Sequence, residues 1–361
     1  MKKLLFLMQL PPPVHGASIM NQHVIDTFVS NKYNYSLIPF KFVDQVDQIG
    51  VFNIKKIIRF FIILFKLLFQ LVFKRPNLVY FTISPAGGAF YRDFIYVVML
   101  KIFRIKIIYH LHGKGIVKNC DKFLKRILYR FVFKNAIVIH LSKLLENDIK
   151  HLPYSKIHFI PNGIEIVKTT AKDSKTDSIK LLFLSNLISS KGLLVLLKAC
   201  RILKEKDLDF SLTIIGAEGD ISFDKLRSEA ILLGVYDNIK ILGPKYGNDK
   251  HTFLNNSDIL VFPTFFDCFP LVLIEGMQFG LPIVSTFEGA IPEIVDDGIN
   301  GFLVNQKDVN SLAEKLETLI RDDDLRKSMR EASRRKFMKY YTLDKFKESI
   351  KKVIHETLYL R

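Results

Sequence analysis

Short apolar runs alternate with longer amphipathic stretches along most of this 361-residue chain. Runs rich in Ile, Val, Leu and Phe are typical of strands buried on both faces of a parallel sheet, and the stretches between them are typical of covering helices. The pattern therefore predicts an α/β protein with two Rossmann-like, doubly wound domains. Strands are expected at Leu4–Met8, Tyr35–Phe40, Leu78–Ile83, Ile105–His110, Ala136–His140, Lys156–Ile160, Leu181–Leu184, Ser211–Ile215, Ile239–Leu242, Ile259–Phe262 and Pro282–Ser285.

The alternation breaks once, and the break predicts the domain boundaries. Residues 166–178 are polar and rich in Lys, Asp, Ser and Thr, which is the composition of a linker. They separate a first domain, 1–165, from a second, 179–340, in keeping with roughly 100–200 residues per domain. In two such domains the carboxyl ends of the strands and the N-termini of the helices face a cleft, where a phosphorylated ligand fits best.

Composition excludes several protein classes. Apolar types make up 49% of the residues and charged types 25%, so the chain is globular rather than disordered or collagen-like. Three scattered cysteines, Cys120, Cys200 and Cys268, fit a reducing compartment and provide no disulfide framework or CxxC metal motif. The basic, apolar first ten residues lack a small-residue cleavage site after them, so we expect a buried strand rather than a signal peptide.

The positive charge is concentrated in the first domain. The chain carries a formal net charge of +17, and residues 1–165 hold 24 Lys and Arg against 8 Asp and Glu. Residues 166–361 hold 29 against 28. A field of this sign favours an anionic partner, which is membrane lipid, nucleic acid or a phosphorylated substrate.

Two segments of the first domain are candidate ligand sites. Gly16 removes a side chain where backbone would approach a ligand, and Ser18 is expected to cap the following helix, although an ordinary strand–helix turn is the simpler explanation. This turn is not G-x-G-x-x-G, which argues against a nicotinamide-dependent dehydrogenase. His110 and His112 point the same way on a strand, so they either reach a ligand or are two structural histidines. A metal pair lacks an evident third ligand.

The second domain contains the stronger candidates. Lys191 precedes a helix, where a cation opposes the helix dipole unless an anion is near, so it suggests phosphate contact over a solvated side chain. Asp267 follows a strand, and Glu275 lies about one turn into an apolar helix. A carboxylate in such surroundings needs partners, and sugar or ribose hydroxyls are suitable donors. The alternative is a structural Glu that caps a neighbouring loop.

With these residues in place, the chain resembles the retaining glycosyltransferases of the GT-B fold, specifically the large family 4 group. The most specific element is an E-x7-E type signature followed by a Glu-Ala-Met-Ala-x-Gly-x-Pro type run, matched by Asp267-x7-Glu275 and by residues 275–282. Supporting elements are Lys191-Gly192, Pro161-Asn162-Gly163, His112-Gly113, Gly289-Ala290-Ile291-Pro292-Glu293 and Asn300-Gly301-Phe302-Leu303-Val304.

The resemblance implies roles for individual residues. Glu275 would bind the ribose of a nucleotide-diphosphate sugar, while Lys191 would bind the diphosphate and Asp267 would lie near the donor sugar. His112, also counted as catalytic, would touch that sugar, and the final segment, 341–361, would cross back onto the first domain. The remaining donor contacts are implied at Gly16, Asn186, Phe269, Pro270, Leu271 and Val272, with the backbone N–H groups of Leu271 and Val272 facing the phosphate.

Three residues depart from the family pattern. Asp267 replaces the usual first Glu, Asn186 replaces a common Arg, and Pro270 replaces a common Gly and removes one N–H. Since Lys191 and helix N–H groups would neutralise the leaving diphosphate, no metal or other cofactor is expected. An Asp322-x-Asp324 match to a metal motif falls in a charged run and is interpreted as solvated surface.

Two stretches of the first domain suggest a membrane partner. Ile57–Phe73 is almost wholly apolar, but it is slightly short for a membrane span and carries Arg59 and Lys66, so a packed or interfacial helix is expected. The segment Asp121–Lys134 places basic residues at successive i+4 positions, a stripe that favours docking on an anionic leaflet over a merely solvated helix face. The stripe consists of Lys122, Arg126, Arg130 and Lys134.

The resemblance implies a retaining sugar transferase, and the basic first domain favours a location at the inner face of a bacterial cytoplasmic membrane. The donor is expected to be a UDP-sugar rather than a GDP-sugar, and the acceptor a lipid-linked oligosaccharide of O-antigen, capsule or exopolysaccharide synthesis. A nucleotide-sugar epimerase of the same fold is the alternative within enzymes. A basic nucleic-acid-binding protein is the alternative outside them, but the sequence lacks a basic–aromatic module or a recognisable reading helix, so no nucleic acid is expected as a partner.

Overall fold

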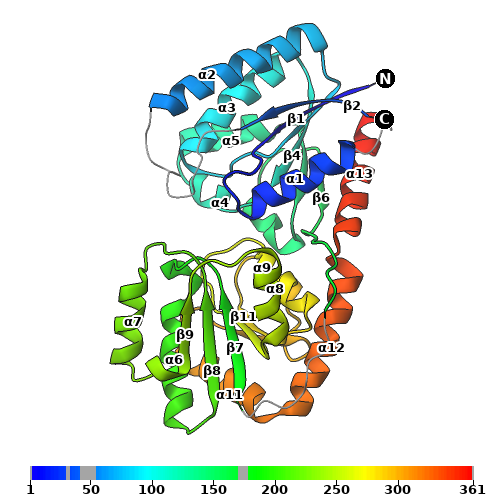
Figure 1. Cartoon of the computed structure of the whole chain (residues 1–361). Coiled ribbons are helices and arrows are strands. Elements are labelled where there is room, and N and C mark those ends of the chain that lie inside the picture. The colour runs from blue at the N-terminus through cyan, green and yellow to red at the C-terminus, as the bar shows by residue number, and fades with distance from the viewer. Residues whose placement is uncertain (1, 30–32, 41–53, 170–177, 360–361) are drawn as a thin grey trace. The chain divides into compact units, whose positions relative to one another are not determined.

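The computed structural model describes residues 2–29, 33–40, 54–169 and 178–359. The chain forms two compact units, one made of Met1–Gly163 with Leu343–Arg361 and the other of Ile164–Thr342, which we call the N-terminal unit and the C-terminal unit. Each unit is a parallel sheet between helices (Figure 1), so the expected pair of doubly wound domains is confirmed. The chain passes from one unit to the other twice.

The N-terminal unit contains a six-stranded sheet in the order β2-β1-β3-β4-β5-β6. Its strands are β1 (Lys3–Met8), β2 (Asn34–Pro39), β3 (Leu78–Phe81), β4 (Lys106–Leu111), β5 (Ile137–His140) and β6 (Lys156–Phe159). Its helices are α1 (Gly16–Val29), α2 (Ile54–Phe69) with the π-helical turn η2 (Gln70–Lys74), α3 (Gly87–Ile102), α4 (Ile116–Asn119), α5 (Phe123–Phe133), the 3₁₀ segment η3 (Lys143–Asp148) and α13 (Leu343–Tyr359).

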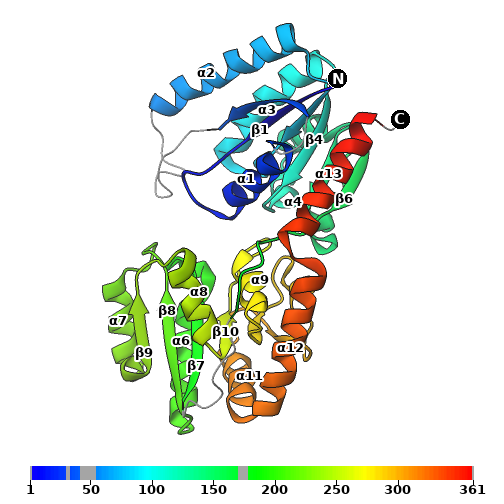
Figure 2. The same ribbon diagram turned by 45° about the vertical axis from the view of Figure 1, so that its right-hand side comes forward.

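Alternating side chains of these strands build two apolar layers. Leu5 and Leu7 of β1 belong to the core that α2, α3 and α5 cover. The neighbouring residue Phe6 points to the other face, where its ring lies 5.4 Å from that of Phe28 in α1. The helices α1 and α13 pack together on this second face (Figure 2). Among the described residues, no helix is both long enough and apolar enough to cross a membrane.

The C-terminal unit contains a second six-stranded sheet, in the order β12-β11-β10-β7-β8-β9. Its strands are β7 (Ile179–Leu184), β8 (Phe210–Ile215), β9 (Ile239–Leu242), β10 (Ile259–Phe262), β11 (Ile283–Thr286) and β12 (Gly301–Val304). Its helical segments are η4 (Ser189–Lys191), α6 (Leu193–Glu205), α7 (Phe223–Leu232), η5 (Tyr236–Asn238), α8 (Gly247–Asn256), α9 (Leu271–Gln278), α10 (Ile291–Ile294), α11 (Val309–Arg321) and α12 (Asp323–Tyr340).

All eleven expected strands are present, and β12 is an additional strand that the sequence pattern did not predict. It is four residues long and begins with Gly301, where an added Cβ would lie 2.0 Å from the carbonyl oxygen of Ile283 in β11. Glycine is therefore required for strand pairing at this point, although glycine in sequence is a signal against a strand.

The strand order places loops of interest side by side within the C-terminal unit. Strands β7 and β10 are neighbours, and the order of connection reverses between them. In open parallel sheets, ligands bind outside the carboxyl ends of the strands at such a switch point. The loops that leave β7 and β10 carry Lys191 and Asp267.

Ile164 and the start of the expected linker 166–178 are attached to the C-terminal unit. The Ile164 amide donates to the Tyr341 carbonyl at 3.0 Å, and the Val167 amide donates to Oε1 of Gln278 at 2.6 Å. Residues 170–177, which form most of that linker, lie outside the described part of the chain.

Candidate functional site

Lys191 is held at the end of β7 by a tight approach of two loops. It ends the short turn η4, and the next residue, Gly192, has a φ of 79°. A Cβ at Gly192 would lie 2.0 Å from the carbonyl oxygen of Pro263, so only glycine allows the β7 loop to touch the β10 loop here. The contact fixes the backbone from which the Lys191 side chain extends.

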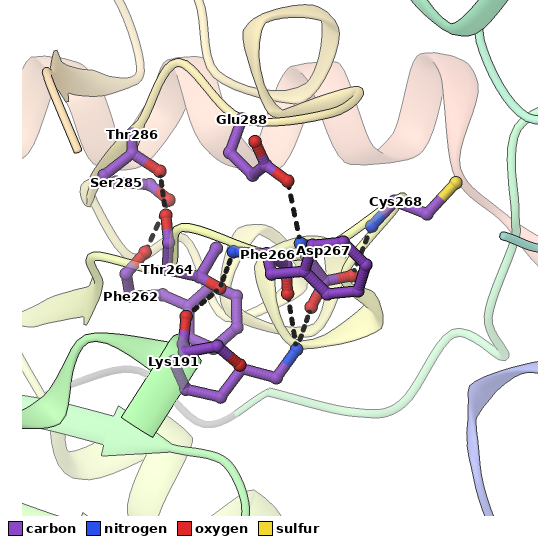
Figure 3. A network of polar contacts seen from close by, with 10 residues as sticks. Lys191, Phe262, Thr264, Phe266, Asp267, Cys268, Ser285, Thr286 and Glu288 are labelled. Carbon is purple, nitrogen blue, oxygen red and sulfur yellow. Dashed lines mark hydrogen bonds and ion pairs between the residues drawn. The ribbon is translucent and has the colours of Figure 1, made fainter. Parts of the chain in front are cut away.

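The Lys191 ammonium group lies against the loop that follows β10 (Figure 3). Its Nζ donates to Oδ2 of Asp267 at 2.6 Å and to the carbonyl oxygen of Phe266 at 3.2 Å. The two paired side chains keep about a fifth of their surface exposed, 20% for Lys191 and 19% for Asp267. The structure therefore brings together the two residues that the sequence singled out separately, as a charged pair that an incoming ligand can reach.

Hydroxyl groups fix the loop that carries Asp267. The Thr264 hydroxyl donates to the Ser190 carbonyl at 3.0 Å, and the Ser285 hydroxyl donates to the Phe262 carbonyl at 2.6 Å. The Thr286 hydroxyl donates to the Thr264 carbonyl (Figure 3). Because these groups are buried or nearly so, the bonds are shielded from water and restrain the loop.

Glu288 is a residue of this site that the sequence analysis missed. It is only 7% exposed, and its Oε1 accepts from the Asp267 amide at 3.0 Å while its Oε2 accepts from the Gln306 side chain at 2.7 Å. The next residue, Gly289, has a φ of 55° and lies so close to the Asp267 carbonyl that a Cβ would approach it to 2.6 Å. Glu288 therefore orients the backbone of Asp267. An acid just past an apolar strand was the available signal.

Glu275 has a partner that no motif indicated. Its Oε1 accepts from Nζ of Lys250 in α8 at 2.7 Å, with side chains 20% and 22% exposed respectively. This contact satisfies the need for a partner that the apolar surroundings imposed on Glu275. The pair leaves the second carboxylate oxygen for other donors.

The N-terminus of α9 is available to an anion. The helix begins after Pro270, and no described side chain caps it or places an acid in its first turn. Leu271 and Val272 open the helix, where amide N–H groups have no intrahelical acceptor. Phe269, another predicted donor contact, is 5% exposed, and its ring packs edge-on against Tyr341 with centroids 6.0 Å apart. Its packing anchors the loop.

Asn186 is exposed beside this site, in the loop after β7, and its carbonyl accepts from the Ile188 amide at 2.8 Å. Asp322 and Asp324 lie elsewhere, at the start of α12. The Asp322 side chain accepts from the Leu325 amide at 2.9 Å as a helix cap, and the Asp324 side chain is 98% exposed. Among the described residues, no group of three or more His, Cys, Asp or Glu is arranged to hold a metal ion.

In the N-terminal unit, the turn before α1 differs from the prediction. Ser18 lies within the first turn of the helix that Gly16 opens and is not its N-cap residue; its hydroxyl accepts from the His15 amide at 3.0 Å and donates to the Pro13 carbonyl at 2.8 Å. The capping acceptor is instead Nδ1 of His15, to which the Ser18 amide donates at 3.3 Å. Burial lowers the pKa of His15, which keeps this ring neutral and able to accept.

His110 and His112 lie together at the end of β4, with ring centroids 4.0 Å apart. The Tyr80 hydroxyl forms a hydrogen bond with Nδ1 of His110, and the Leu141 amide donates to Nδ1 of His140 at 2.9 Å. The Nε2 atoms of all three histidines are buried without a hydrogen-bond partner among the described residues. His110 is fully buried and bonded within the unit, so it is structural, whereas His112 stays partly exposed.

Burial keeps these imidazoles neutral. It lowers the pKa of His112 to about 3, with further lowering from His15 and His140, and it lowers the pKa of His140 to about 4. The pKa of His110 falls well below its ordinary value, also through burial first. A neutral His112 is a hydrogen-bonding group at physiological pH rather than a cation.

The sequence of the second half matches a known family. Residues 167–336 match the family described as glycosyl transferases group 1. An uncharacterized glycosyltransferase of Methanocaldococcus jannaschii is 29% identical over 251 residues, 68% of this chain and 67% of the relative. The amylovoran biosynthesis glycosyltransferase AmsK of Erwinia amylovora is 29% identical over 225 residues, and the match spans 59% of this chain but only 55% of that relative.

Solved structures share the whole fold. A sucrose-phosphate synthase of Thermosynechococcus elongatus superposes with a TM-score of 0.79 at 15% identity, over 98% of this chain and 99% of that one. HepE of Anabaena in complex with UDP superposes with a TM-score of 0.78 at 18% identity, over 98% of this chain and 100% of that one. At these identities the likeness establishes the fold alone, a chain of two doubly wound units.

Proposed function

Because residues 167–336 belong to the glycosyl transferases group 1 family, we propose that the chain is a retaining glycosyltransferase. It transfers a sugar from a nucleotide-diphosphate sugar to a lipid-linked oligosaccharide during bacterial surface polysaccharide synthesis. The donor is a UDP-sugar in preference to a GDP-sugar. Two similar proteins support these choices, one named for amylovoran biosynthesis and one solved with UDP.

The Lys191–Asp267 pair beside the open N-terminus of α9 is the observation that carries the proposal. When the bond between the anomeric carbon and the phosphate oxygen breaks, its electron pair leaves with the nucleoside diphosphate. Lys191 and the N–H groups of Leu271 and Val272 stabilise the negative charge that develops there. No metal is required for this step. The acceptor oxygen then bonds to the anomeric carbon, and its proton passes to an oxygen of the departing diphosphate.

Asp267 and Glu275 take different parts of the donor in this proposal. Asp267 exchanges part of its contact with Lys191 for the hydroxyls of the donor sugar, as the diphosphate draws Lys191 away. Glu275 receives the ribose hydroxyls on the oxygen that Lys250 does not occupy. From the N-terminal unit, the turn at Gly16 contributes backbone N–H to the diphosphate, and neutral His112 contributes a hydrogen bond to the sugar.

The basic surface of the N-terminal unit supports a location of the enzyme at the inner face of the cytoplasmic membrane, where a lipid-linked acceptor would be found. Lys122, Arg126 and Arg130 are exposed along α5 and its start, as a docking stripe requires. The Arg126 guanidinium also donates to the Cys120 carbonyl at 3.0 Å, so part of its role is structural.

Mass spectrometry of products tests the proposal. The purified chain is incubated with a panel of UDP- and GDP-sugars, with and without a polyprenyl-diphosphate glycan, and each reaction is repeated in excess EDTA. We expect extension of the lipid-linked glycan by one sugar, undiminished by EDTA. An isomerised nucleotide sugar formed without acceptor would identify an epimerase. Loss of transfer in EDTA, restored by magnesium or manganese, would overturn the metal-free step.

A further inference from the structure

The outer face of α2 and η2 is apolar and open to solvent. Figures 1 and 2 show α2 along the outside of the N-terminal unit. Within this one segment of the described chain, ten large apolar side chains are between 40% and 69% exposed. They are Ile54, Ile57, Ile58, Phe61, Ile62, Phe65, Leu68, Phe69, Val72 and Phe73. Six of them, at 54, 58, 61, 65, 68 and 72, alternate spacings of four and three and so form one continuous stripe.

The same helix has a second apolar face that secures it to its own unit. Ile63 and Leu67 are 5% and 0% exposed within the core of the unit. The Phe60 ring stacks on Tyr96 of α3 with centroids 5.5 Å apart. Since the inner face already supplies the packing that the fold needs, the outer stripe is not required for folding. A helix that is apolar on both sides is typical of a position between protein and another apolar phase.

The layer of helices to which this stripe belongs is rich in basic residues. Helices α2, α3 and α5 form the layer on this side of the sheet, and together they carry nine Lys and Arg. Their one acid, Asp93, is buried and paired with Arg92 at 2.6 Å. On α5, Phe123 and Leu124 are a further 72% and 74% exposed. The layer therefore combines an exposed apolar surface with an excess of basic over acidic side chains.

We infer that α2 lies in the plane of an anionic membrane, with the stripe inserted among the acyl chains nearest the headgroups and the surrounding cations at the level of the phosphates. Charge complementarity favours lipid over a protein partner, because Lys is depleted in protein interfaces whereas basic flanks are typical of interfacial helices. This inference rests on the proposed lipid-linked acceptor and adds how the chain attaches to the membrane. The apolar stripe of α2 inserts, and the basic stripe on α5 contributes only electrostatic attraction.

An environment-sensitive reporter tests insertion directly. The chain has no Trp, so Phe65→Trp introduces a single indole at a position that is 68% exposed. Vesicles of phosphatidylcholine with about a third phosphatidylglycerol should shift its emission to shorter wavelength, and brominated acyl chains should quench it. Leu232→Trp, on α7 and 79% exposed, is the matched control and should show neither change. If vesicles do not change the fluorescence emission of the Trp introduced by Phe65→Trp, the inference is overturned.

Salt separates insertion from electrostatic docking. Full-length chain bound to these vesicles should remain largely bound at about 0.5 M salt, whereas Phe61→Ser with Phe65→Ser should lower vesicle partitioning more than tenfold and release the remainder in salt. Leu232→Ser should bind like the parent. Complete release of the parent by salt contradicts insertion. Ultracentrifugation tests a second copy of the chain as the alternative occupant of the apolar stripe. A concentration-dependent dimer of the parent that the double variant does not form would also contradict insertion.

Activity distinguishes this inference from the proposed function. The double variant should bind UDP and transfer sugar to a water-soluble acceptor analogue as the parent does, while transfer to a vesicle-bound acceptor falls at least fivefold. A parent that inserts into vesicles but transfers no sugar refutes the proposed function and leaves the membrane surface standing. If the parent and the double variant transfer sugar equally well to a vesicle-bound acceptor, the inference is refuted. The proposed function still stands in that case.

Discussion

The two units share one architecture but differ in which of their surfaces is specialised. The segment of α2 and η2 exposes as many large apolar side chains, ten, as all the described residues of the C-terminal unit. The C-terminal unit instead gathers its distinctive groups in loops at one end of the sheet, around Lys191 and Asp267. The same arrangement of sheet and helices thus carries an exposed apolar surface in the N-terminal unit and a cluster of charged loop residues in the C-terminal unit.

The polar groups of the two units differ in charge as well. In the C-terminal unit, the Lys191–Asp267 and Lys250–Glu275 pairs are charged and partly exposed. In the N-terminal unit, burial keeps the imidazoles of His112 and His140 at the end of the sheet neutral. One unit therefore has paired charges at the end of its sheet, and the other has neutral rings there. Four predictions test how far this contrast extends.

The largest effect is expected for Lys191→Ala. Removing a positioned cation from the departing diphosphate should lower turnover by a factor on the order of 10². Thermal melting should be almost unchanged, since the side chain reaches toward the site rather than the core. Lys206→Ala, which removes a surface lysine paired with Glu317, is the matched control and should keep full activity. A folded Lys191→Ala protein with near-normal turnover would remove Lys191 from the mechanism.

Acid should weaken the N-terminal unit before the C-terminal unit. The folded pKa of His140 is about 4, below its ordinary value of 6.5, so the unfolded chain binds more protons and stability falls as pH drops below about 6.5. At pH 5 this one group costs the folded state on the order of 2 kcal/mol. Hydrogen exchange, corrected for its intrinsic pH dependence, should show early loss of protection in β4 and β5 but not in β7 and β10.

His140→Asn is the control for this pH effect. The Asn side-chain oxygen can accept from the Leu141 amide as Nδ1 does, and it takes up no proton, so the loss of protection near pH 5 should be smaller. The C-terminal unit has one histidine, His251, and it is only partly buried. Equal sensitivity of both units to acid would contradict the assignment to buried imidazoles.

An intermediate effect is expected when Asp267 loses its orientation. Glu288→Ala removes the acceptor of the Asp267 amide and should reduce turnover about tenfold. Glu288→Gln keeps an acceptor oxygen and should retain most activity, so rescue by Gln separates positioning from charge. Asp267→Glu, which restores the common family residue, should be tolerated better than Asp267→Asn. The reverse ranking in steady-state kinetics would count against a carboxylate role.

The smallest effect is expected from one charge on the layer of α2, α3 and α5, which we propose contacts the membrane. Lys122→Gln should weaken binding to anionic vesicles about fivefold at low salt, since each such charge contributes about 1 kcal/mol. The difference should vanish at high salt because the field decays within about 8 Å even at physiological ionic strength. Lys206→Gln, on the C-terminal unit, should have no effect in sedimentation with vesicles. If Lys122→Gln and Lys206→Gln weaken vesicle binding equally, the two units do not differ in their affinity for anionic membranes.

Much of the fold could be predicted because the apolar runs in the sequence are the segments that become buried strands. Buried parallel strands are continuous apolar runs, so β1 to β11 were visible in the sequence, whereas β12 begins with a glycine that its neighbour requires. The expectation that Ser18 caps α1 was wrong because a local rule favours Ser over His, yet His15 has the acceptor in the right position.

The site could be predicted only in part, for a related reason. Lys191, Asp267 and Glu275 follow recognisable strand–loop–helix junctions, so their positions were evident. Glu288 and Lys250 act through partners 21 and 25 residues away, and such contacts exist only after the sheet has set its strand order. Sequence spacing indicates where chemistry gathers but not which side chains orient it.

The double passage of the chain between units has a consequence for its synthesis. Helix α13 packs against α1 in the N-terminal unit, and Phe346 stacks on His110 with centroids 6.4 Å apart. The ribosome makes all of Ile164–Thr342 between these partners. Synthesis at roughly 5–20 residues per second takes roughly 10 to 40 seconds for this segment. During that time one apolar face of the first sheet lacks the helix α13 that later covers part of it. During that interval the nascent N-terminal unit is a natural client for a chaperone, while the C-terminal unit needs no later segment to close its sheet.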